Sequence, residues 1–100
     1  MNLIEKFQEW RRENARKERA KKRKRLRSIV AEMRKEENNG RLRHLLFSFP
    51  DVVSVTLDSG GWSKARCEAR LRSGHEFTGR SLFAQDAIRN CAAKVAFYLR

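Results

Sequence analysis

The sequence has few of the residues that interrupt helices: one proline, Pro50, and five glycines in 100 residues. Between residues 2 and 37 it has neither, and this segment consists mainly of alanine, arginine, lysine, glutamate and leucine, which are strong helix formers. We therefore expect one long helix, or two helices with a frayed junction. The segment Asn38-Asn39-Gly40 is expected to end it, because glycine and asparagine readily adopt the left-handed conformation at a helix C-terminus.

Cysteine is also scarce. Cys67 and Cys91 are too few for a disulfide framework, and neither they nor His44 and His75 have the spacing of metal ligands. We expect two buried thiols, no metal or cofactor, and a reducing intracellular compartment, cytoplasmic or nuclear. The sequence has no apolar run near the roughly 18 residues of a membrane span and no apolar signal-peptide core, so no membrane partner is expected. It also lacks a phosphate-binding loop, a paired-carboxylate motif and a nucleophile elbow, which predicts that the protein is not an enzyme and has no catalytic residues.

Acidic residues are half as numerous as basic ones: 12 Asp and Glu stand against 24 Lys and Arg, for a formal net charge of +12. Residues 11–27 contain 11 basic and 2 acidic residues, a net charge of +9, which leaves +3 for the other 83 residues. This segment has no apolar stripe, so it must be solvated or lie on a polyanion. Nucleic-acid backbones are the commonest such partner, because neutralising phosphates releases condensed counterions.

We therefore predict that residues 1–40 form a basic helical arm that contacts phosphates. The predicted contacts in the arm are Arg16, Lys17, Arg19, Lys21, Lys22, Arg23, Lys24, Arg25 and Arg27. Apolar residues also occur at helical spacing near the end of the arm, at Leu26, Ile29, Val30 and Met33. This stripe could dock on its own domain or on a second copy, so a homodimer remains open.

Residues 41–100 are predicted to form a small domain. The apolar segment 41–50 indicates a short helix that caps the core, and residues 52–58 indicate a strand. The residues of that strand expected to face the core are Val53, Val55 and Leu57. In residues 63–72, apolar and charged residues alternate, with Ala65, Cys67, Ala69 and Leu71 on one side. One buried and one wet face indicate an antiparallel sheet.

A three-residue loop, Arg72-Ser73-Gly74, is expected to lead into a third strand, with Gly74 in the left-handed conformation. This loop length pairs Ala69 with Phe77 and keeps Phe77 on the core face. The fold class is therefore α+β: a long basic N-terminal helix, then a three-stranded antiparallel sheet packed against a C-terminal helix.

The C-terminal helix is expected over residues 82–99, capped by Ser81. Its predicted buried stripe is Ala84, Ala87, Ile88, Cys91, Ala92, Val95 and Leu99. Its predicted wet face is Gln85, Asp86, Arg89, Asn90 and Lys94.

The strand-strand-strand-helix order resembles the double-stranded RNA-binding domain. The segment Phe77-Thr78-Gly79-Arg80-Ser81 resembles the end of that family's third strand and the turn after it, and residues 87–96 resemble its alanine-rich final helix. The resemblance covers about residues 49–100 and implies recognition of duplex RNA by shape. The family's first helix would correspond to residues 26–37 or to residues 41–47.

The match to the family's binding surface is partial. Its Gly-Pro-x-His loop is represented by Gly61-Trp62-Ser63-Lys64, and its three basic positions on the last helix fall at Gln85, Asp86 and Arg89, so a degenerate member is expected. The predicted contacts in the domain are Trp62, Lys64, Arg80, Arg89 and Lys94.

Three functions follow from these patterns. The leading hypothesis is a non-enzymatic protein that binds duplex or hairpin RNA, of a size that would suit a viral or phage accessory protein that masks RNA. The second is a dimerising protein-interaction module of the same fold, with incidental nucleic-acid binding. The third is DNA binding through the wet face of the sheet, where Arg66, Arg70 and Arg72 would lie.

Overall fold

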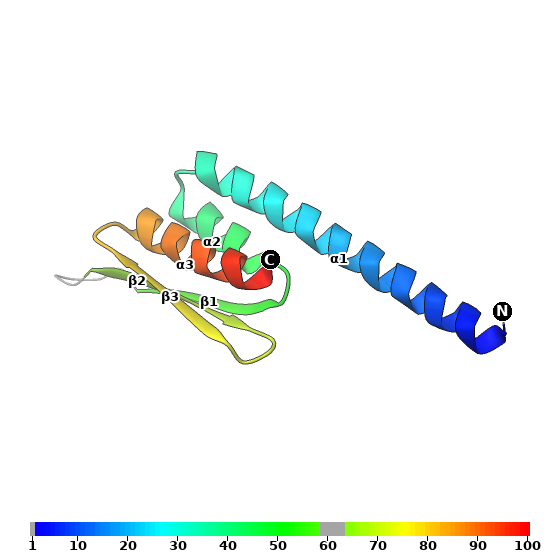
Figure 1. Cartoon of the computed structure of the whole chain (residues 1–100). Coiled ribbons are helices and arrows are strands. Elements are labelled where there is room, and N and C mark those ends of the chain that lie inside the picture. Colours follow the sequence, from blue (N-terminus) through cyan, green and yellow to red (C-terminus); the bar gives the residue numbers. More distant parts are fainter. Residues whose placement is uncertain (1, 59–63) are drawn as a thin grey trace.

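The long helix expected at the N-terminus is one uninterrupted element. In the computed structural model, which describes residues 2–58 and 64–100, α1 (Leu3–Lys35) is 33 residues long. The side-chain oxygen of Asn2 caps it by accepting a hydrogen bond from the backbone N–H of Glu5, at 2.9 Å. At 1.5 Å per residue this helix is about 50 Å long, and it makes the molecule elongated, with principal extents of 66 × 27 × 17 Å (Figure 1).

The expected stop at Asn38-Asn39-Gly40 is wrong in its mechanism. The C-cap of α1 is Glu36, whose backbone is extended with φ −84° and ψ 131°, and no left-handed glycine follows it. Asn38 caps the next helix, α2 (Asn39–Phe47), by accepting a hydrogen bond from the N–H of Arg41 at 3.1 Å. Asparagine is favourable at either end of a helix, so the residue type alone did not distinguish a stop from a start.

The rest of the chain forms two further layers. Strands β1 (Val52–Asp58), β2 (Ala65–Leu71) and β3 (Glu76–Ser81) form an antiparallel sheet in that order. Helix α3 (Ala84–Leu99) packs on β2 and β3, and α2 lies beside it against β1. Helix α1 crosses above α2 and α3, and its N-terminal half projects beyond the domain (Figure 1). The protein is therefore α+β, as expected.

The hairpin between β2 and β3 confirms the predicted register. The N–H of Leu71 donates to the carbonyl of His75 at 2.9 Å, and Ala69 lies opposite Phe77. Gly74 has a φ of +94°, the left-handed conformation that a three-residue loop requires.

The prediction that Val53 of β1 faces the core is wrong. The pairing of β1 with β2 shifts register between Val52 and Ser54, which is a β-bulge. As a result Val52 is buried, whereas Val53 is 43% exposed. Val55 and Leu57 are partly buried against the core, as expected. A bulge changes the side of the sheet that a residue faces, and strict alternation along the sequence does not reveal it.

The start of α3 also differs from the expectation. The segment at Gly79 is not a turn, because β3 continues to Ser81, which pairs with Ala65. Ser81 therefore does not cap α3: the helix begins at Ala84, and its N-cap residue, Phe83, makes no side-chain capping hydrogen bond. Serine is common at helix starts, but here the sheet extends over the position.

The core lies between the sheet and α2 and α3. The alternation predicted for β2 is confirmed, since Ala65, Cys67, Ala69 and Leu71 are all buried. The buried residues of α3 are Ala87, Ile88, Cys91, Ala92, Val95 and Ala96, while Ala84 and Leu99 are only partly buried. Gly79 brings β3 close to α3: a Cβ there would overlap the carbonyl oxygen of Ala87 and lie 2.9 Å from the Cα of Cys91.

The apolar stripe of α1 docks on its own chain. Leu26, Ile29 and Met33 are buried and belong to the same cluster as the core of the domain, with Val30 packed at its edge. Burying an aliphatic side chain is worth about 1.5–3 kcal/mol, so this packing fixes the C-terminal end of the arm. Both segments considered for the first helix of the domain are therefore helical, and α2 is the one packed against β1.

Candidate nucleic-acid interface

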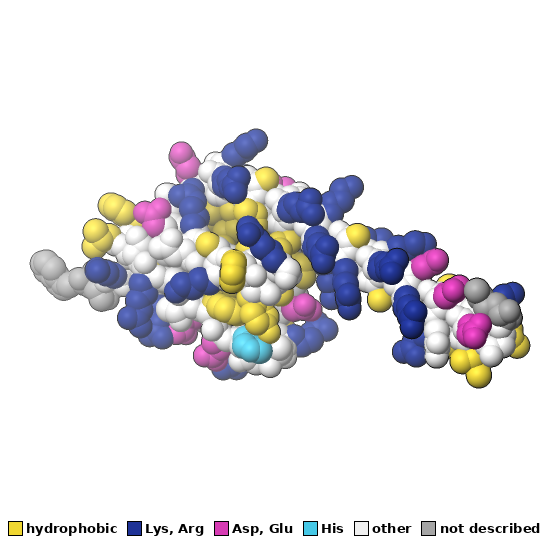
Figure 2. Space-filling view, in the orientation of Figure 1, with side chains coloured by type: hydrophobic (Ala, Val, Ile, Leu, Met, Phe, Trp, Pro, Cys, Tyr) yellow, Lys and Arg dark blue, Asp and Glu magenta, His cyan; other side chains and the backbone are white. Residues whose placement is uncertain are grey.

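The basic segment of α1 is accessible to a partner over its whole length. The predicted arm contacts that are exposed are Arg16, Lys17, Arg19, Lys21, Lys22, Arg23, Lys24, Arg25 and Arg27. Between Arg16 and Arg25, eight of the ten residues are basic. Because successive residues of a helix are rotated by about 100°, cations project on every side of these turns. Figure 2 shows Lys and Arg side chains along the visible face of the arm.

The four described contacts predicted in the domain do not form one surface. Lys64 precedes β2, and Arg80 lies opposite Arg66 on the outer face of the sheet. Lys94 is on α3, where its Nζ donates to the backbone carbonyl of Thr78 at 2.6 Å. The predicted contact Trp62 lies outside the described residues.

The fourth, Arg89, is less exposed than the predicted wet face required. Its Nη2 donates to the carbonyl of Glu36 at 2.5 Å, and its Nε donates to the carbonyl of Met33 at 3.4 Å. Both carbonyls lie at the C-terminal end of α1, where a positive charge is favourable. The side-chain amide of Gln85 donates to the neighbouring carbonyl of Glu37. These two side chains of α3 hold the end of α1.

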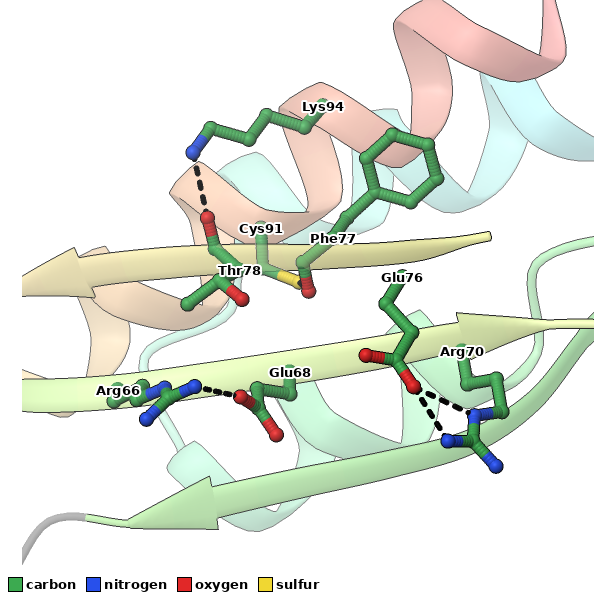
Figure 3. Close-up of polar contacts among 8 residues, drawn as sticks. All are labelled: Arg66, Glu68, Arg70, Glu76, Phe77, Thr78, Cys91 and Lys94. Carbon is green, nitrogen blue, oxygen red and sulfur yellow. Dashed lines mark hydrogen bonds and ion pairs between the residues drawn. The ribbon is translucent and has the colours of Figure 1, made fainter. Parts of the chain in front are cut away.

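The outer face of the sheet carries ion pairs. Arg70 contacts one carboxylate oxygen of Glu76 through Nε at 3.0 Å and through Nη2 at 2.5 Å, and Arg66 pairs with Glu68 (Figure 3). Exposed pairs of this kind add little stability, but they place a carboxylate beside Arg66 and beside Arg70. This face therefore has a lower positive potential than its arginines suggested.

A groove between α1 and α3 brings two predicted contacts, Arg23 and Arg27, together with two arginines that were not predicted, Arg34 and Arg100. Arg23, Arg27 and Arg34 of α1 and Arg100 line a cavity of about 540 Å³. The other residues that line this cavity are Leu26, Val30, Ala31 and Ala96. We call it the arginine groove. The spacing of Arg23, Arg27 and Arg34 places all three on one side of the helix, which was visible in the sequence. The nearness of Arg100 was not.

The two cysteines lie inside the core and not at this surface. Cys67 and Cys91 are fully buried, and the Cys91 Sγ donates to the carbonyl of Phe77 at 3.4 Å. A hydrogen bond with Cys91, together with burial, raises the pKa of the Cys67 thiol far above its ordinary value. A thiol that stays protonated is a poor nucleophile.

No protein-family model, curated protein or solved structure matches this chain. Within the described residues, no helix combines the length and apolarity needed to cross a bilayer. A functional assignment therefore depends on the charges and geometry of the chain itself.

Proposed function

We propose that this protein is a non-enzymatic RNA-binding protein whose basic helix contacts the phosphates of a hairpin or duplex. The observation that carries the proposal is the basic part of α1, which has exposed cations on every side and no apolar stripe. A helix of this kind is suited to a groove, where phosphates line two walls. The domain would then be a degenerate double-stranded RNA-binding domain that positions the arm.

The docking of α1 makes the arm an effective ligand-binding element. Leu26, Ile29 and Met33 bury one end of the helix in the core, and Arg89 holds its last carbonyls. The cations are therefore presented on a helix that is already anchored, so binding loses less conformational entropy than it would with a free peptide.

The shape of the arm suggests which RNA it binds. A helix with side chains is about 10–12 Å across, whereas the major groove of A-form RNA is deep and narrow. A hairpin whose loop or bulge widens that groove is therefore a better ligand than a continuous duplex. The major groove of B-form DNA is about 12 Å wide, so duplex DNA is the necessary comparison.

The arm provides a test by salt dependence. Full-length protein is titrated with a fluorescent RNA hairpin at several salt concentrations. With at least about four phosphate contacts, log K should fall against log salt with a slope of about −3 to −4, taking the coefficient of about 0.9 per contact known for DNA. A slope shallower than about −2 would overturn the assignment of affinity to the arm.

Matched substitutions locate the contacts. Neutralising Lys21, Lys22 and Lys24 to glutamine should reduce the magnitude of the slope by about 2 to 3, because each lost phosphate contact removes about 0.9. The control is Arg66→Gln with Arg70→Gln, on the outer face of the sheet, which should change it little. If the control variant loses as much as the arm variant, the sheet is the binding face and DNA becomes the better candidate.

A protein-interaction module is the second candidate, and one observation favours it. The tip of α1 exposes Leu3, Ile4, Phe7 and Trp10, with the rings of Phe7 and Trp10 stacked at 6.0 Å. Contiguous exposed apolar side chains often mark a protein contact. A tight dimer in sedimentation experiments, combined with no hairpin binding at physiological salt, would support this function instead.

A further inference from the structure

Helix α3 exposes two large aromatic side chains near its C-terminal end. Phe97 is 77% exposed and Tyr98 is 44% exposed. Together with Phe77, Ala93 and Lys94 they line a hollow of about 660 Å³ between α3 and β3. We call it the aromatic hollow. Exposed aromatic rings gathered at one place are unfavourable in water and mark a contact surface.

The aromatic hollow is formed before any ligand arrives. The Tyr98 ring packs at 5.3 Å from Phe77 and 4.8 Å from His75, and its hydroxyl shares a hydrogen bond of 3.1 Å with His75 Nδ1. The Lys94 ammonium is held at the rim by the carbonyl of Thr78 (Figure 3). The Tyr98 ring, with a cation at the edge of the hollow, can therefore stack on a planar group without losing much freedom.

The aromatic hollow and the arginine groove lie on neighbouring sides of the same helix. Ala93 lines the hollow and also lines the continuation of the groove, beside Arg34, Arg89 and Arg100. Only the small side chains of α3 separate cations from aromatic rings. Figure 2 shows hydrophobic surface bordered by Lys and Arg on the visible side of the domain. A phosphate and a nucleobase linked in one nucleotide present the complementary pair of chemistries.

We infer that α3 binds unpaired nucleotides of the RNA, with phosphates along the arginine groove and bases stacked on Phe97 and Tyr98. This inference rests on the proposed function: α1 takes the stem, and α3 takes the single strand next to it. The ligand is thus a junction between duplex and single-stranded RNA.

Charge and hydrogen bonding disfavour other occupants. No Asp or Glu lines the arginine groove, its continuation or the aromatic hollow, among the residues that the structure describes. A second copy of the protein that docked here through the same surfaces would place its own cations against these cations, which would repel it. A peptide strand added along β3 would need its outward carbonyls, but Lys94 already bonds to that of Thr78, and Asn90 bonds to that of Arg80 at 3.2 Å.

The test uses the full chain and three RNAs: a blunt hairpin, the same hairpin with an unpaired tail of about six nucleotides, and the tail alone. Wild-type protein should bind the tailed hairpin about tenfold or more tightly than the blunt one, since each stacked base adds measurable affinity. Phe97→Ser should remove most of that preference and leave the blunt hairpin unaffected. The matched control is Phe83→Ser, because Phe83 is an exposed aromatic residue outside both surfaces. This variant should keep the preference for the tailed hairpin.

Two results would overturn the inference: equal affinity of the wild type for both hairpins, or a tail preference that survives Phe97→Ser with a fold intact by thermal melting. If the hairpins do not bind but the tail alone binds and depends on Phe97, the proposed stem contact fails and the α3 site stands. If Phe97→Ser changes the sedimentation of the free protein and no RNA affinity, the surface joins two copies and the inference is wrong.

Discussion

Replacement of Gly79 by alanine tests how closely α3 lies on the sheet. A Cβ at this position would overlap the carbonyl oxygen of Ala87 and the backbone nitrogen of Cys91, and it would lie 2.9 Å from the Cα of Cys91. Carbon atoms pack best at about 3.5–4.0 Å, so the two carbon atoms alone would have to move apart by about 0.6 Å or more. All three atoms belong to the helix backbone and cannot rotate away.

The cost can be set from the packing. Overfilling a core costs about 1–3 kcal/mol, and occasionally more. We expect the upper end, about 3 kcal/mol, because moving α3 loosens every buried side chain on that helix. Domains of this size have a total stability of about 5–15 kcal/mol, so this is a large share. The melting temperature should fall by about 12–24 °C, at about 4–8 °C per kcal/mol.

The free energy of unfolding of the Gly79→Ala variant is measured by urea denaturation. Two other glycines provide controls in the same assay. Gly74→Ala meets no atom within 4 Å but keeps a φ of +94°, so it should cost about 1 kcal/mol in backbone strain. Gly40→Ala lies within α2 and meets only the side chain of Asn38, at 3.2 Å. Its gain in helix propensity is up to about 1 kcal/mol, and we expect little net change.

The relative stabilities of the three glycine variants test whether α3 packs closely on β3. If the free energy of unfolding of Gly79→Ala is within about 1 kcal/mol of the wild-type value, α3 does not approach β3 as described. The geometry of the aromatic hollow is then wrong as well. If Gly74→Ala is the most destabilised of the three, backbone strain in the hairpin matters more than packing under α3.

Three further changes test the core and the docking of α1. Val95→Asp places an unpaired carboxylate at a fully buried site, which costs several kcal/mol, so thermal melting should show no cooperative transition; a retained transition would mean that another helix face is buried. Arg89→Gln removes the guanidinium bonds to Met33 and Glu36, so it should lower stability by about 1.5–3 kcal/mol and speed hydrogen exchange at the end of α1. Above pH about 8.5 the unfolded Cys67 thiol ionises while the buried one, with its raised pKa, stays protonated. The free energy of unfolding should therefore fall by up to about 1.4 kcal/mol per pH unit, and replacing both thiols, Cys67→Ala with Cys91→Ala, should flatten this dependence in urea titrations, because Cys67→Ala alone leaves Cys91 buried without its hydrogen-bond partner.

Features that depend on neighbouring residues could be predicted. The absence of glycine and proline before residue 38 was enough to predict α1, because helix propensity is a local property. The alternation from Ala65 to Leu71 and the left-handed Gly74 similarly determined β2 and the register of the hairpin. The exposure of the basic arm followed from its lack of any apolar stripe.

Features that depend on other elements could not be predicted in this way. The bulge at Val53 arises where β1 pairs with β2, and the role of Ser81 was decided by the strand beside it. Asn38 could equally well end one helix or begin the next, because asparagine is favourable at both ends of a helix. In each case a local signal was real, but a partner distant in sequence determined its use.

The candidate site likewise has one part that could be predicted from the sequence and one part that depended on tertiary packing. The charge of the arm was readable residue by residue, since exposed cations need no partner to be recognised. The docking of Leu26, Ile29 and Met33 on their own domain, with a second copy as the alternative, was decided only by packing. That packing brings Arg100 beside Arg23 and Arg27 and turns Arg89 toward the end of α1. Each of these contacts joins α1, or the residue after it, to a C-terminal residue more than 50 positions away, and only burial of a shared apolar surface brings the two segments together.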